Sequence, residues 1–168
     1  MKRLIPLASF AALGIFLAGC ANYQLGTTLP PHLKTIAVPA FANDSGELDL
    51  EARITAATLK EFQRDGTLRV ADADSADIVL EGRIVTCEFE AVRYARGASL
   101  RAEEQRMTVR CEITATERAT GEVIHNGVVE GDATFQSNGD LTTAKRSAYR
   151  LVAEDVAHEV VNAVISAW

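Results

Sequence analysis

The chain has 168 residues, and its 17 Lys and Arg against 23 Asp and Glu give a formal net charge of −6 at pH 7. This acidic balance argues against a nucleic-acid partner, because nucleic-acid binding requires a basic face that neutralises phosphates. The length fits a single domain whose core is large enough to fold without disulfide or metal staples.

The first 20 residues have the layout of a bacterial lipoprotein signal peptide. A basic start precedes an almost wholly apolar stretch over residues 4–18, which is too short to span a bilayer comfortably. The sequence Leu-Ala-Gly-Cys at 17–20 then matches the lipobox pattern; the alternative is an ordinary signal peptide that ends near a cysteine. We expect residues 1–19 to be cleaved, Cys20 to carry acyl chains, and residues 20–33 to form a lipidated tether.

The residue that follows Cys20 favours the outer membrane. It is Ala21 rather than the Asp that commonly retains lipoproteins in the inner membrane. Loss of Lys2 and Arg3 leaves 15 basic against 23 acidic residues, so the acyl chains rather than bulk charge must hold the protein to the membrane. The sequence thus predicts a lipid-anchored outer-membrane protein that faces the periplasm.

The first half of the remaining chain predicts a strand, a helix and a second strand. Residues 34–41 form a compact apolar run, and Pro39 places this strand at a sheet edge or ends its ladder. From residue 47 to residue 64 apolar side chains recur at helical spacing, and an Asp-Gly pair then ends the helix. Residues 68–71 predict a short strand. The helix is expected to be a right-handed crossover between two neighbouring parallel strands.

The second half predicts an antiparallel meander and a final helix. An extended segment runs from residue 78 to about residue 94, residues 96–99 turn the chain, and residues 107–116 alternate strictly between apolar and polar side chains. A further strand is expected over residues 122–135, and residues 138–140 are expected to cap a long helix. The apolar stripe of this helix comprises Leu141, Ala144, Ala148, Leu151, Val152, Val156, Val160, Ala163 and Val164.

These elements predict a single α+β domain over residues 34–168. The order of the elements indicates a mixed, largely antiparallel sheet of about four to five strands with two helices packed on one face. The other face would carry Thr, Arg and Glu side chains, so it is expected to face water or a wet partner.

Signals of an enzyme are weak throughout the chain. The histidines His32, His125 and His158 lie far apart without metal-ligand spacing, so each is expected on the surface. No nucleophile elbow or phosphate-binding glycine loop occurs, and the Asp-rich run at 72–77 lacks the later glycine and glutamate of a calcium loop. We expect a protein that is not an enzyme and has no cofactor apart from the covalent N-terminal lipid.

Two cysteines of the expected domain are candidates for a disulfide. If the strands on either side of residues 96–99 fold back on each other, Cys87 can lie directly opposite Cys111, with Phe89 opposite Val109. An oxidising periplasm permits such a bridge. The alternative is two small buried thiols, which protein cores tolerate well.

Arginines concentrate around the same turn. Residues 91–110 contain five arginines against two glutamates, an excess of positive charge in an acidic chain. Arg93, Arg96 and Arg101 could bind phosphates or sugar acids, because Arg binds both through two parallel hydrogen bonds. The alternative is a charged hairpin tip that is merely solvated.

Several stretches carry a family resemblance over nearly the whole mature chain. They are the run from HLKTIAVPAF to ADIVLEGRIV at 32–85, TERATGEVI at 116–124, the final helix, and a lipid cysteine shortly before a Tyr and a Leu-Pro pair. In these the chain resembles the lipopolysaccharide-assembly lipoprotein family (LptE). The resemblance implies a tether to the inner leaflet of the outer membrane and a partner, the β-barrel LptD, whose lumen the lipoprotein plugs. It also implies help in barrel folding and direct contact with lipopolysaccharide on its way to the cell surface.

The resemblance suggests a role for the polar sheet face and for the arginines near the turn. A polar sheet face suits the water-filled interior of a barrel. Arg93, Arg96 and Arg101 become candidates for lipopolysaccharide contact by charge alone, while a Cys87–Cys111 bridge is not part of the family pattern. The alternative is a periplasmic adaptor with a TolB- or CsgG-like domain, either a cell-wall synthase activator or a secretion subunit. Residues 93–106 are too charged for a membrane-inserting strand, which disfavours a pore.

Overall fold

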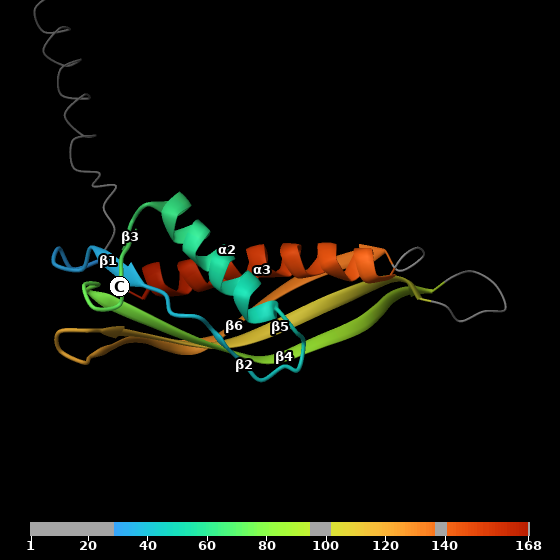
Figure 1. Cartoon of the computed structure of the whole chain (residues 1–168), viewed down its shortest axis with the longest axis horizontal. Coiled ribbons are helices and arrows are strands. Elements are labelled where there is room, and N and C mark those ends of the chain that lie inside the picture. The colour runs from blue at the N-terminus through green and yellow to red at the C-terminus, as the bar shows by residue number, and fades with distance from the viewer. Residues whose placement is uncertain (1–28, 95–101, 137–140, 168) are drawn as a thin grey trace, which may run out of the picture.

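The computed structural model describes residues 29–94, 102–136 and 141–167. They form one mixed sheet in which the strand order is β3-β1-β4-β5-β6, with β2 also paired to β4, and two helices cover one face of it (Figure 1). The predicted α+β class, with both helices on one face, is confirmed. The expected signal peptide, the lipid attachment at Cys20 and most of the tether lie outside the described residues. In chain order the elements are β1 Thr35–Ala37, β2 Ala42–Asn43, α2 Leu50–Asp65, β3 Arg69–Val70, β4 Ile78–Tyr94, β5 Ala102–Glu117, β6 Val123–Gln136 and α3 Leu141–Ile165.

The first apolar run forms the strand β1, which is shorter than the strand predicted over residues 34–41, and the short strand β2 follows the run. Both pair with β4 in parallel: Ile36 of β1 lies beside Ile78, and Asn43 of β2 lies beside Ile84. Pro39 lies between them and has no N–H to donate, so the ladder ends after β1 and resumes in β2. Strand β3 pairs with β1 in parallel, which confirms α2 as a crossover between neighbouring parallel strands.

Helix α2 begins three residues later than predicted. Its buried side chains recur every four residues, at Leu50, Ile54, Thr58 and Phe62, as a helix with one core-facing stripe requires. The helix ends at Gly66, whose φ of 78° is left-handed and whose N–H donates to the carbonyl of Phe62. Glycine takes this conformation without strain, so the predicted stop is confirmed.

Strands β4, β5 and β6 form the predicted antiparallel meander, but with a different register. Cys87 lies opposite Val109, and Phe89 lies opposite Met107. The ladder shifts by one residue between Ile84 and Thr86, where Val85 is inserted as a β-bulge. The register predicted from a simple hairpin is therefore wrong: Cys87 and Phe89 pair two residues away from the predicted partners, a slip that keeps each side chain on its predicted face of the sheet. The expected turn at 96–99 lies outside the described residues.

Helix α3 packs closely against β6. Its buried stripe matches most of the predicted positions, but Leu151 is 40% exposed and does not belong to it. A Cβ atom at Gly131 would lie only 2.6 Å from the backbone nitrogen of Val156, so the strand presents glycine where the helix approaches. The carboxylate of Asp155 accepts the N–H of Asp132 at 2.9 Å, on the side of β6 that has no neighbouring strand. The cap expected at 138–140 lies outside the described residues.

Candidate functional site

The open face of the sheet carries the polar side chains of three long strands. Strict alternation along β5 turns Met107, Val109 and Cys111 toward the helices, where each is fully buried. The alternate residues therefore point away from the helices. We call this surface the polar sheet face. On β5 it comprises Glu104, Arg106, Thr108, Arg110, Glu112, Thr114 and Thr116, and it extends to their register partners on β4 and β6.

The arginines of this face are paired with carboxylates on neighbouring strands. The Nε of Arg110 lies 2.6 Å from Glu130, and the Nε of Arg106 lies 3.4 Å from Asp132. The Glu130 contact raises the pKa of Arg110, which keeps that guanidinium charged. These side chains are about half exposed, so each ion pair contributes little stability. Their effect is to neutralise the face locally while leaving it rich in hydrogen-bonding groups.

The predicted basic island around the hairpin is therefore largely neutralised in the described residues. Arg93 forms an ion pair with Glu104 at 3.1 Å, directly across the β4–β5 ladder. Arg96 and Arg101 lie outside the described residues. Counting charges along the chain could not reveal the carboxylates of β6, which only the sheet register brings beside the arginines of β5.

Two exposed valines interrupt the polar sheet face near the turn between β5 and β6. Val128 is 64% exposed and lies opposite Glu112, and Val123 is 54% exposed and lies opposite Thr116. A polar surface with a small apolar margin can make both hydrogen bonds and apolar contacts with a partner.

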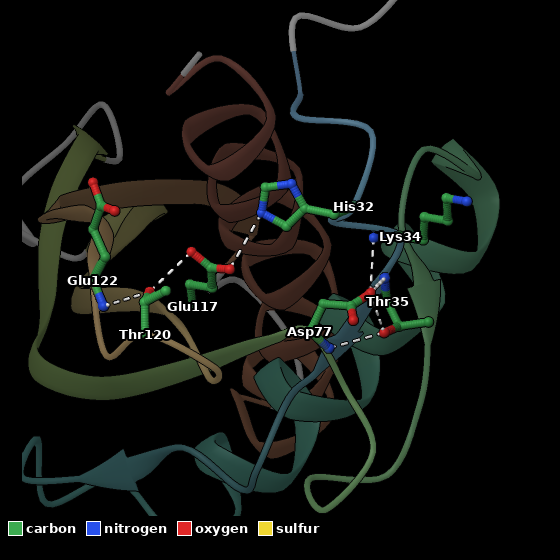
Figure 2. Close-up of polar contacts among 7 residues, drawn as sticks. All are labelled: His32, Lys34, Thr35, Asp77, Glu117, Thr120 and Glu122. Carbon is green, nitrogen blue, oxygen red and sulfur yellow. Dashed lines mark hydrogen bonds and ion pairs between the residues drawn. The ribbon is translucent and has the colours of Figure 1, made fainter.

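A single carboxylate fixes the place where the chain enters the sheet. Figure 2 shows the Oδ2 atom of Asp77 accepting the backbone N–H groups of Lys34 and Thr35 and the hydroxyl of Thr35, at 2.9, 2.9 and 2.7 Å. The N–H of Asp77 donates in return to the Thr35 hydroxyl. These hydrogen bonds lower the pKa of Asp77. The largest contribution comes from the Lys34 N–H, and the next largest comes from the Thr35 hydroxyl. Beside this network the exposed His32 lies 3.2 Å from Glu117, as expected of a surface histidine.

The predicted face-to-face pairing of Cys87 and Cys111 is wrong. Cys111 lies opposite Ile84, and Cys87 lies opposite Val109, so the two cysteines occupy different rungs of the ladder. Both are free thiols. Burial raises the pKa of Cys87 to about 11 and that of Cys111 to about 12, so neither forms a reactive thiolate at neutral pH. The structure therefore has one buried thiol, that of Cys111, and one half-buried thiol, that of Cys87, which is nearer to the alternative of two buried thiols that the sequence left open.

The part of the chain that the structure describes contains no helix both long and apolar enough to cross a bilayer. Within the same residues, no group of three or more His, Cys, Asp or Glu side chains is placed to hold a metal ion.

Comparison with known proteins identifies both a family and a fold. The model of the family described as LptE, lipopolysaccharide-assembly, matches residues 33–167. No curated protein matches the chain. A solved protein of Xanthomonas campestris is 16% identical with a TM-score of 0.57 over 84% of this chain and 91% of its own. A hypothetical protein of Chlamydia trachomatis is 10% identical, with a TM-score of 0.55 over 78% of this chain and 97% of its own. At such identities these likenesses show the fold alone.

Proposed function

The chain belongs to the lipopolysaccharide-assembly (LptE) family, and we propose that it is the lipid-anchored subunit that plugs the LptD β-barrel in the outer membrane. In this role it assists assembly of the barrel and contacts lipopolysaccharide during insertion into the outer leaflet. The observation that carries the proposal is the family match, which spans the domain from residue 33 to residue 167. The family is one of non-enzymatic envelope lipoproteins. We extend that property to this chain, which would act by binding and carry no cofactor except the lipid on Cys20.

The polar sheet face supports the proposal physically. The interior of an outer-membrane barrel is polar and hydrated, so a plug needs a surface rich in hydrogen-bonding groups. The cross-strand pairs Arg106–Asp132 and Arg110–Glu130 provide such a surface. The exposed Val123 and Val128 would add apolar contact at its margin.

Site-specific crosslinking tests which face meets the barrel. A photo-crosslinking residue in place of Thr108, at the centre of the polar sheet face, should crosslink LptD in outer-membrane fractions of cells that carry the full chain. The matched control places the same residue at Lys60, on the exposed side of α2. We expect strong crosslinking from the first position and little from the second. Absence of LptD from both the crosslinked and the co-purified material would overturn the proposed function.

The lipid anchor is tested separately from the barrel. Cys20→Ala should leave an unprocessed or mislocalised protein, and normal outer-membrane fractionation of this variant would contradict the anchor. The adaptor and secretion-subunit alternatives gain no support from any feature of the described residues, whereas the LptE family match covers most of the chain.

A further inference from the structure

A surface groove runs between the two helices, on the side of the molecule opposite the polar sheet face. Three adjoining hollows of about 340, 210 and 690 Å³ form it. Arg53 lines the first and the second hollow, and Lys60 and Glu154 line the second and the third. The first hollow lies where the start of α2 meets the first turns of α3. Its lining includes Leu48, Asp49, Arg53, Lys145, Arg146 and Tyr149.

The first hollow is basic although the whole chain is acidic. Arg53, Lys145 and Arg146 line it against one carboxylate, that of Asp49. Among the described residues, no carboxylate forms an ion pair with Arg53 or Arg146. The Nε of Arg53 is moreover buried without a hydrogen-bond partner there. A buried guanidinium N–H without an acceptor is unfavourable, and no group of the described residues offsets this cost at Arg53.

The cations farther along the groove differ in this respect. Arg64, beside the third hollow, bonds Glu61 at 2.7 Å, and Arg150, beside the second, bonds Glu154 at 3.0 Å. Lys60 is the one cation farther along the groove that has no ion pair among the described residues, whereas all three cations of the first hollow lack one. This contrast selects the first hollow as the place where an anion would bind.

Neighbouring contacts keep the first hollow available to an anion. The Nζ of Lys145 lies 4.3 Å from the centroid of the Phe89 ring, a cation–π contact that positions the ammonium without neutralising it. Tyr149 donates to Glu47 at 2.5 Å, so the phenol rather than Arg53 bonds this nearby carboxylate. The start of α2 has no side-chain cap, and the positive end of its helix dipole adds to the field of the three cations.

We propose that the hollow defined by Arg53, Lys145 and Arg146 binds the phosphate group of an anionic headgroup. Guanidinium groups bind phosphate through parallel hydrogen bonds, and an ammonium adds a point charge. Leu48, which is 85% exposed, places an apolar side chain at the rim of the hollow, as suits an amphiphile that carries its phosphate beside a hydrocarbon chain. The identification of that amphiphile as lipopolysaccharide rests on the proposed function, whereas phosphate binding does not.

Calorimetric titration of the full-length protein in nonionic detergent with inorganic pyrophosphate tests the site. The double variant Arg53→Gln and Arg146→Gln should bind pyrophosphate at least about tenfold more weakly, because it loses both charge-assisted contacts. Arg150→Gln is the matched control, since it removes a cation of the same helix that is already paired with Glu154, and it should bind like the wild type. If the double variant does not fold, the exposed Arg146→Gln alone should still weaken binding severalfold. No binding to the wild type, or equal binding to wild type and Arg146→Gln, would overturn the site.

The source of the phosphate is resolved with three kinds of detergent micelle, which carry phosphatidylglycerol, lipopolysaccharide or lipopolysaccharide stripped of its phosphates. Preference for intact over stripped lipopolysaccharide supports the site with lipopolysaccharide as the source. Equal binding of phosphatidylglycerol and lipopolysaccharide, both above the stripped form, supports it with any phospholipid as the source. Stripped lipopolysaccharide that binds as tightly as the intact form would overturn it. Crosslinking to LptD from position 108 in the same variants reports the proposed function independently, so failure of one does not imply failure of the other.

Discussion

Replacing Gly131 with alanine places a methyl group in the interface between α3 and β6. The added Cβ would lie 2.6 Å from the backbone nitrogen of Val156 and 2.7 Å from its Cγ2 atom, both well inside ordinary van der Waals contact. A backbone atom of a helix cannot rotate away, so α3 must shift outward along its packed face. Overpacking of this kind costs about 1–3 kcal/mol. Removal of a strand glycine returns about 0.5–1 kcal/mol, because alanine loses less backbone entropy on folding.

The net effect of Gly131→Ala is therefore expected to be destabilising by about 1–2 kcal/mol. For a domain near 150 residues this corresponds to a fall in Tm of roughly 3–6 °C, measured by circular dichroism during heating of the full-length protein. Gly127→Ala is the matched control on the same strand. Its Cβ would meet only the imidazole of His125, with the Nε2 atom at 3.1 Å, which is the far end of a flexible side chain, so its Tm should equal or slightly exceed that of the wild type. Equal Tm values for the two variants would refute the close approach of α3 to β6.

Three further predictions concern contacts elsewhere in the domain. Gly82→Ala should lower the free energy of unfolding by about 1–3 kcal/mol, because its Cβ would overlap the Phe41 ring. This loss should shrink in a Phe41→Ala background, and strict additivity in the double-mutant cycle would contradict the clash. Asp77→Asn should cost about 1 kcal/mol at pH 7. Since the folded pKa of Asp77 lies below 3.8, the stabilisation is complete above that value and lost as the pH falls through the folded pKa, so denaturation curves of variant and wild type should converge in acid. The buried Cys111 should alkylate only after unfolding, and a reductant-dependent Tm would contradict the description of Cys87 and Cys111 as free thiols.

Patterns of hydrophobicity were sufficient to predict the elements but not how they meet. The alternation around Met107 predicts β5 and its two faces, and the apolar stripe through Val152 and Val156 predicts α3. The start of α2 is missed by three residues, because Asp49 takes a left-handed φ of 64° that no sequence signal indicates. Leu151 fits the helical stripe by spacing and still lies at the surface, because the groove beside α2 leaves that flank open.

The surface features depend on register and packing, which local sequence does not encode. Cys87 pairs with Val109, two residues away from the predicted Cys111, and the alternation of side chains is the same in both registers. Arg106 and Arg110 are neutralised by residues of β6 that lie more than 19 positions further along the chain. The basic hollow around Arg53 joins residues of α2 to residues of α3 that are about ninety positions away. Such sites arise from tertiary structure, so a count of charges in a sequence window identifies the wrong arginines.

The hydrogen bond that the Asp155 carboxylate accepts from the backbone of β6 matters when many copies of the protein are crowded on a membrane. An outer strand exposes amide groups that can template pairing with the outer strand of another molecule, which is the first step of intermolecular sheet growth. Asp155 already occupies the amide of Asp132, in the second half of that strand. A strand from another molecule would have to displace a charged acceptor there. The final helix therefore hinders edge-to-edge aggregation as well as burying the core.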